Sequence, residues 1–193
     1  MSANAAASGR HAVIFLRGAT LLLAASGLIY ELVIGTMASY VHGDTTRQFA
    51  MSFGLFTAGL GAGAGASRWV SCRPWWLLAW VELALCVYGI FLVPVCMPHG
   101  FPGAWVIARF GVASVIGGIL VGLELPVIAG LLGDFGGTMA LDYAGALVAS
   151  WLFPFAAMPL LGLDGTAAMA GGVNALAAFG CMWFAHNARR DEP

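Results

Sequence analysis

The sequence predicts an all-α protein of the membrane, a polytopic helix bundle with about six transmembrane helices and both termini in the cytoplasm. Of the 193 residues, 61% are hydrophobic and only 9% are charged, whereas soluble domains carry about 25% charged residues. So few charges cannot cover a water-facing surface, so lipid is expected to surround most of the protein. Six apolar runs also approach or exceed the roughly 20 residues that a bilayer core requires.

The six runs divide the chain into a start, a membrane domain and a tail. Residues 1–11 are small and polar and are expected to be disordered, residues 12–185 form the transmembrane domain, and 186–193 form a cytoplasmic tail. The spans are expected at 12–41, 49–66, 75–97, 104–132, 138–161 and 166–185.

The first span has a rival interpretation as a signal peptide. Arg10 and Arg17 precede the apolar run 21–23, and residues 24–26 resemble a cleavage site. The apolar run continues well past that point to Val41, so an uncleaved span is favoured.

Turn-forming residues separate the later spans. Pro154 and Pro159 are expected to bend the end of the fifth span. Such prolines are tolerated where neighbouring helices satisfy the freed carbonyls.

The second and fourth spans are both rich in glycine, which hints at an internal repeat. The breaks between the later spans lie at 67–74, 98–103, 133–137 and 162–165.

The arginines predict how the bundle is oriented. All eight basic residues are arginine, and six spans place only Arg47 on the side opposite both termini. Positive residues favour the cytoplasmic side, so both termini are expected there, in a bacterial inner membrane. The arginines on the cytoplasmic side are Arg10, Arg68, Arg73, Arg189 and Arg190.

Glycines at four-residue spacing predict a packing face on the second span. Because no strand precedes them and they lie inside an apolar run, a dinucleotide-binding loop is excluded. In lipid, this spacing lets another helix backbone approach closely, either from this chain or from another subunit. The glycines are Gly59, Gly61, Gly63 and Gly65.

Ionisable residues inside the spans are the best candidates for a functional site, because each costs about 2.5–3.5 kcal/mol to insert. Depth along each span suggests an ion pair between Glu31 and Arg109. The inner half then holds Glu82, Glu124 and Asp142, opposed only by Arg17, which can reach the interface.

This excess of acid on the cytoplasmic side has three interpretations. The carboxyls are neutral or internally paired struts that fix helix register, or they bind a cation such as a polyamine, or they meet a base of another subunit. The sequence leaves all three open.

Other chemistry finds little support. Asn174 is expected to form hydrogen bonds between helices, and the tryptophans near span ends form the interfacial belt. The four cysteines show no paired spacing, and no histidine has a second ligand at regular spacing, so no metal, cofactor or catalytic pair is expected. A net charge of −1 gives no reason to expect nucleic acid.

Several short motifs resemble the membrane domain of bacterial membrane-bound spermidine synthase-like proteins, the polyamine aminopropyltransferases. The resemblance covers about Gly27 to Leu163. Its motifs are Gly-Leu-Ile-Tyr-Glu-Leu-Val at 27–33, Gly-Asp-Thr at 43–45, Val-Glu-Leu at 81–83, Gly-Leu-Glu-Leu-Pro at 122–126, Leu-Asp-Tyr-Ala-Gly-Ala-Leu at 141–147 and Pro-Leu-Leu-Gly-Leu at 159–163.

In that family a soluble Rossmann-like aminopropyltransferase domain usually follows the membrane helices, with a Gly-rich loop and paired aspartates. This sequence has no such loop and no such acidic motif. The resemblance therefore implies the membrane part, without the reaction.

Three functions are compatible with this sequence. The first is a non-catalytic subunit that packs into a larger membrane complex or a homo-oligomer. The second is a protein that binds or transports polyamines or other organic cations through Glu82, Glu124 and Asp142. The third is a membrane anchor for a separate aminopropyltransferase chain.

Overall fold

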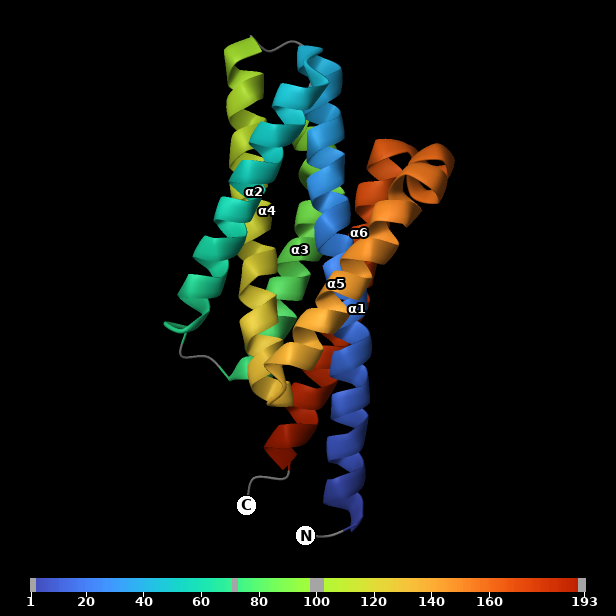
Figure 1. Cartoon of the computed structure of the whole chain (residues 1–193). Helices are drawn as coiled ribbons and strands as arrows, with labels where there is room; N and C mark the ends of the chain where they lie inside the picture. The colour runs from blue at the N-terminus through green and yellow to red at the C-terminus, as the bar shows by residue number, and fades with distance from the viewer. Residues whose placement is uncertain (1–2, 71–72, 98–102, 191–193) are drawn as a thin grey trace.

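A computed structural model describes residues 3–70, 73–97 and 103–190, and every regular element in these ranges is a helix (Figure 1). The all-α prediction is therefore confirmed for the described part of the chain. The elements are α1 (Ala3–His42), α2 (Thr45–Ser67), α3 (Pro74–Cys96), α4 (Gly103–Leu132), α5 (Phe135–Leu152), the π-helix η1 (Phe153–Ala157) and α6 (Met158–Arg190).

The first helix begins earlier than the sequence predicts. We expected disorder over residues 1–11, yet α1 already starts at Ala3. Three consecutive alanines at 5–7 explain the difference, because alanine has the highest intrinsic helix propensity and the following apolar run carries the helix onward.

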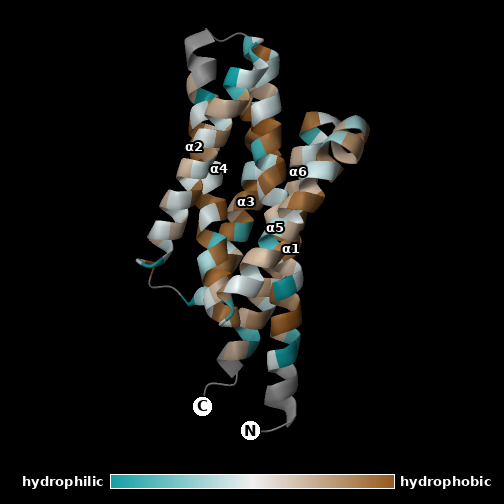
Figure 2. Ribbon diagram, viewed as in Figure 1, coloured by the Kyte–Doolittle hydropathy of each residue, from teal (hydrophilic) through white to brown (hydrophobic). Residues whose placement is uncertain are grey.

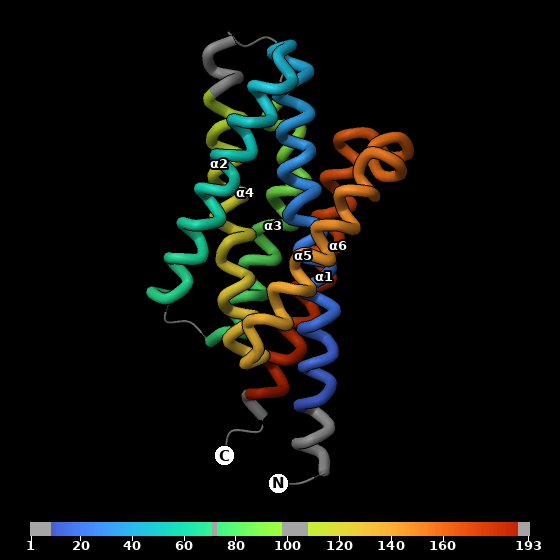
Figure 3. The backbone as a smooth tube through the Cα atoms, viewed as in Figure 1, coloured from blue at the N-terminus to red at the C-terminus, as the bar shows by residue number. Residues whose placement is uncertain are grey.

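Five helical stretches are long and apolar enough to cross a membrane. The last of them combines α5, η1 and α6, and it changes direction at Gly162, whose φ of 66° and ψ of −172° lie outside helical values. Figure 3 shows the chain doubling back there, so this stretch contains two segments of opposite direction. Hydrophobic residues predominate along these helices (Figure 2). The stretches are Gly9–His42, Thr45–Ser67, Pro74–Cys96, Ala108–Leu132 and Phe135–Ala188.

The predicted disturbance near Pro154 takes the form of the π-helix η1. Proline has no backbone N–H to donate, so the regular α-helical ladder is interrupted at this position. The backbone returns to α-helical geometry at Met158.

Two hairpin turns have the same construction. Gly43 and Gly133 end α1 and α4 with positive φ angles of 72° and 64°, a conformation that glycine adopts without steric cost. The next residue, Asp44 or Asp134, then caps the following helix by accepting a hydrogen bond from a backbone N–H three residues later.

The helices pack as two interlocked halves, α1–α3 and α4–α6. α2 packs mainly on α4, α5 mainly on α1, and α3 on α6. In Figure 1, α2 splays away from one end of the bundle and α5 from the other, and the start of α1 and the end of α6 lie at the same end.

The contacts show that each helix runs opposite to its counterpart in the other half. Gly27 of α1 lies against Val121 of α4, whereas the rings of His42 and Phe110 meet further along, so α1 and α4 are antiparallel. α3 and α6 are antiparallel too, because Gly89 lies beside the carbonyl of Ala167 and Gly171 lies beside the carbonyl of Cys86.

The packing partners correspond between the halves: α2 on α4 matches α5 on α1, and α1 on α6 matches α4 on α3. The contacts of α2 on α4 and of α5 on α1 are both made through a glycine. The described helices are therefore arranged as in an inverted repeat, an architecture common among membrane transporters, where ligands bind between the repeats.

Only two of the four glycines predicted to form the packing face of α2 lie against α4. A Cβ added at Gly59 would lie 2.6 Å from the carbonyl oxygen of Val115, and one added at Gly63 would clash with the carbonyl of Ile119. Gly61 and Gly65 meet nothing within 4 Å. Gly118 and Gly122 of α4 complete the contact, since each lies against the α2 backbone.

This packing predicts different outcomes for two matched substitutions. Gly63→Ala is expected to cost about 1–3 kcal/mol because the added methyl group meets backbone that cannot move aside. Gly61→Ala should cost nothing, because its position is open and alanine favours helices. Thermal denaturation of the detergent-solubilised protein measures both, and equal midpoints for the two variants would contradict the assigned face.

Candidate functional site

The three acids singled out from the sequence lie near one another in the structure. Glu82 of α3 is fully buried and Glu124 of α4 is 5% exposed, while Asp142 of α5 is half-buried. Glu124 interacts electrostatically with both of the others, so each lies within electrostatic range of it. Three consecutive helices thus bring their carboxyls to one region of the bundle.

Glu82 has no hydrogen-bond partner for either of its side-chain oxygens, and Oε1 of Glu124 has none. Buried polar atoms are satisfied in the great majority of cases, and an unpaired one in a low-dielectric interior is costly. These two carboxyls therefore form an unsatisfied polar centre.

Asn174 of α6 joins this centre. It is fully buried, and neither its Oδ1 nor its Nδ2 has a partner. The antiparallel register of α3 and α6 places it level with Glu82, because Gly171 lies beside Cys86 and the chains run in opposite directions from there. Cys181, two turns further along the same buried face of α6, interacts electrostatically with Glu82 and Glu124.

Glu82 and Asn174 lie on the third helix of each half, where the two halves meet along the antiparallel contact of α3 with α6. Both residues therefore lie at the interface between the halves.

Tyr30 of α1 closes one side of the centre. Its ring is fully buried, and its hydroxyl donates a hydrogen bond to the carbonyl of Leu85, at 3.0 Å. Its ring meets that of Tyr88 edge to face, with centroids 5.3 Å apart. Tyr30 also interacts electrostatically with Glu82 and Glu124, so it belongs to the same cluster.

A second group of aromatic rings packs between α1, α3 and α6. Phe184 of α6 stacks on Trp75 of α3 with ring centroids 5.1 Å apart, and its centroid lies 5.2 Å from that of Phe15 of α1. Trp75 is seven residues before Glu82, about 10 Å along α3. Glu82, Glu124 and Asn174 together make up the polar centre.

The register of α1 on α4 does not favour the ion pair suggested for Glu31 and Arg109. Glu31 is one turn beyond Gly27, which lies against Val121, whereas Arg109 adjoins Phe110 at the level of His42. At ~1.5 Å per residue, the two positions are roughly 13 Å apart along the helices. Oε1 of Glu31 is buried without a hydrogen-bond partner.

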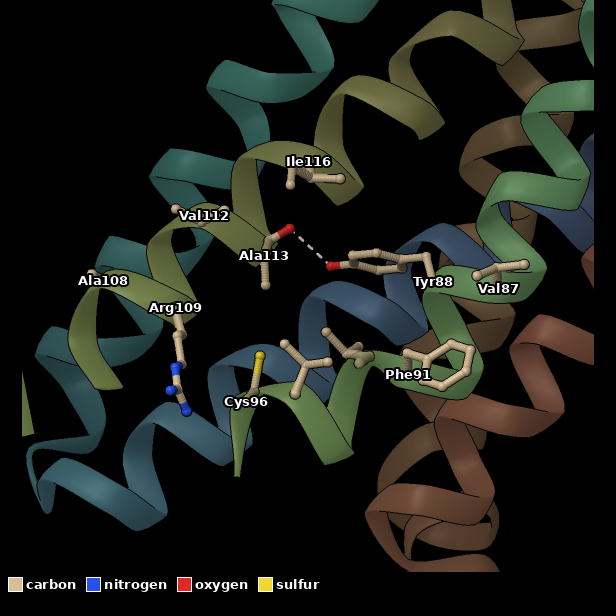
Figure 4. Close-up of a pocket in the computed structure, with 11 residues that line it drawn as sticks. Val87, Tyr88, Phe91, Cys96, Ala108, Arg109, Val112, Ala113 and Ile116 are labelled. Atoms are coloured by element: carbon tan, nitrogen blue, oxygen red, sulfur yellow. Dashed lines mark hydrogen bonds between the residues drawn. The ribbon is translucent and has the colours of Figure 1, made fainter. Parts of the chain in front are cut away.

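Arg109 instead lines an apolar pocket of about 560 Å³ between α3 and α4. Figure 4 shows its side chain extending along the pocket toward the end of α3 that carries Cys96, while Tyr88 spans the pocket and donates a hydrogen bond of 2.8 Å to the carbonyl of Ala113. This pocket and the polar centre are lined by different residues.

The sequence pointed to the carboxyls but gave Tyr30 no role beyond its motif. It predicted hydrogen bonds between helices for Asn174, whereas neither polar atom of its side chain has a partner. A polar amide in an apolar span was the available signal for Asn174. Its proximity to Glu82 depends on the register of α6 on α3, which the residues themselves do not reveal.

Chemically, the polar centre can accept hydrogen bonds from a small cation. Its free atoms are three carboxylate oxygens and one carboxamide group. Among the described residues, no group of three or more His, Cys, Asp and Glu side chains is arranged to hold a metal ion.

Comparison with known proteins supports the family resemblance over part of the relatives' length. A polyamine aminopropyltransferase of Leptospira interrogans is 32% identical over 180 residues, covering 84% of this chain and 34% of the relative. Polyamine aminopropyltransferase 2 of Ralstonia nicotianae is 33% identical over 178 residues, covering 86% and 34%. A polyamine aminopropyltransferase of Corynebacterium efficiens is 31% identical over 185 residues, covering 86% and 34%.

No family model and no solved structure matches the chain. The chain spans about a third of the length of the curated relatives that it matches. It is therefore similar to one part of polyamine aminopropyltransferases, and its apolar helices make that part suited to a membrane.

Proposed function

We propose that this chain is a non-catalytic membrane subunit that packs into a larger assembly with an aminopropyltransferase. The observation that carries the proposal is the match of most of this chain to only a third of proteins named polyamine aminopropyltransferase. Attachment of an aminopropyltransferase to the membrane through these helices is the form of assembly that the resemblance suggests.

An open face on α2 supports the proposal that a partner protein contacts this chain in the membrane. α2 splays from the bundle (Figure 1), and the space beside Gly54, Gly61 and Gly65 is empty to 4 Å. Small residues at such spacing allow a second helix to approach closely in lipid. We assign this face to contact with the assembly.

A specific observation favours a second candidate function, binding of an organic cation. Inverted repeats in membrane proteins commonly bind ligands at the repeat interface, and the unsatisfied polar centre lies there in this chain. That candidate rests on fold-level analogy together with the site itself.

Purification from native membranes in mild detergent tests the assembly. We expect a species heavier than the 20.0 kDa chain, containing an aminopropyltransferase subunit and transferring aminopropyl groups. Gly61→Leu should shift it toward smaller species because it fills the open face of α2. Gly130→Leu, at an equally open position on α4, is the control. A monodisperse monomer with no transferase subunit would refute the proposal.

We further propose six membrane crossings, with both termini in the cytoplasm, because the last apolar stretch reverses at Gly162. Single cysteines in a cysteine-free background test this with a membrane-impermeant maleimide applied to whole cells. Arg47→Cys should be labelled from outside, whereas Arg68→Cys should be labelled only after the cells are opened. The reverse pattern would invert the orientation.

A further inference from the structure

We propose that the polar centre binds a primary alkylammonium group, held by Glu82, Glu124 and Asn174 at the interface of the inverted repeat. This deepens the second candidate function by naming its ligand class and site, and it does not depend on the proposed assembly.

The number of hydrogen-bond acceptors in the centre matches a primary ammonium. A primary ammonium has three N–H donors arranged around one nitrogen, as a lysine side chain does. The centre offers three acceptor groups from three helices, namely the carboxylates of Glu82 and Glu124 and Oδ1 of Asn174. All of these have buried atoms that lack a partner within the described structure. One ammonium can therefore donate hydrogen bonds to acceptors on three helices at once.

The acids of the site favour a cation over a neutral ligand. Two carboxyls lie in the bundle interior, and Asp142 adds a third at its edge. Burial disfavours the ionised form of such groups unless each meets a positive charge and is hydrogen-bonded. Arg17, the base expected to offset these acids, has an exposed side chain. A bound ammonium would supply that positive charge and allow a carboxyl to ionise.

The number of ligands in the centre fits an ammonium better than a metal ion. Metal cations such as Ca²⁺ require six or more oxygen ligands, and Mg²⁺ requires near-octahedral geometry. The described residues hold no group of three acidic, histidine or cysteine side chains placed for a metal. An ammonium donates directional hydrogen bonds and needs only three acceptors.

Aromatic rings lie beside the centre and suit the alkyl part of such a ligand. Tyr30 meets Tyr88 edge to face and interacts electrostatically with Glu82 and Glu124, and an ammonium close to an aromatic face is attracted to it. Asp142 is half-buried and within electrostatic range of Glu124, so it adds negative charge toward the edge of the bundle.

Calorimetric titration of the purified chain in detergent with n-butylammonium chloride tests the proposal. Tetramethylammonium has the same charge but no N–H donor, and sodium has no alkyl group. We expect binding of n-butylammonium and none of the other two. Glu82→Gln and Asn174→Leu should each weaken it about tenfold or more, because each removes a hydrogen bond to a charged group.

Glu31→Gln is the matched control, since Glu31 is another intramembrane acid with an unpartnered buried oxygen, outside the centre. Its affinity should equal that of the unmodified chain. Size-exclusion profiles establish which variants fold. In the unmodified chain, the thermal midpoint should rise with n-butylammonium concentration by mass action and stay unchanged with tetramethylammonium.

Several results would overturn the inference. They are equal binding of tetramethylammonium, binding of sodium in place of the amine, an equal loss in Glu31→Gln, or no binding to the folded chain at millimolar n-butylammonium. Because the isolated chain is used, these results are independent of whether it enters a larger assembly.

Discussion

Close approach of helix backbones at glycine is the constraint on which this bundle depends. In lipid no hydrophobic effect draws helices together, so packing and polar contacts must do so. Gly59 and Gly63 bring α2 onto the backbone of α4 near Gly118 and Gly122, and Gly145 brings α5 onto the backbone of α1 at Leu21. These two contacts fix the depth of α2 against α4 and of α5 against α1.

The polar centre follows from that geometry. With α1 and α4 held antiparallel, α3 and α6 also pack in antiparallel register, and their buried polar residues Glu82 and Asn174 come to the same level. An apolar bundle retains such residues at a cost in stability. Apolar side chains at the same positions would serve packing without that cost.

Composition predicted the fold class because so few charges cannot cover a water-facing surface. Turn residues predicted most helix ends within a few residues, since Gly43, Asp44, Gly133 and Asp134 act locally through backbone conformation and capping. The start of α1 was the main difference, because alanine propensity prevailed over the small polar composition of residues 1–11.

What the sequence by itself determined was therefore local or additive: the solvent, the helices, their turns and the presence of costly carboxyls in apolar spans. Tertiary structure decided which of these residues meet. Gly61 and Gly63 have the same chemistry but face opposite environments, and Glu82 lies level with Asn174 while Glu31 and Arg109 lie at different depths. The physical reason is that helix register depends on backbone contacts between distant segments, and no short pattern of residues encodes it.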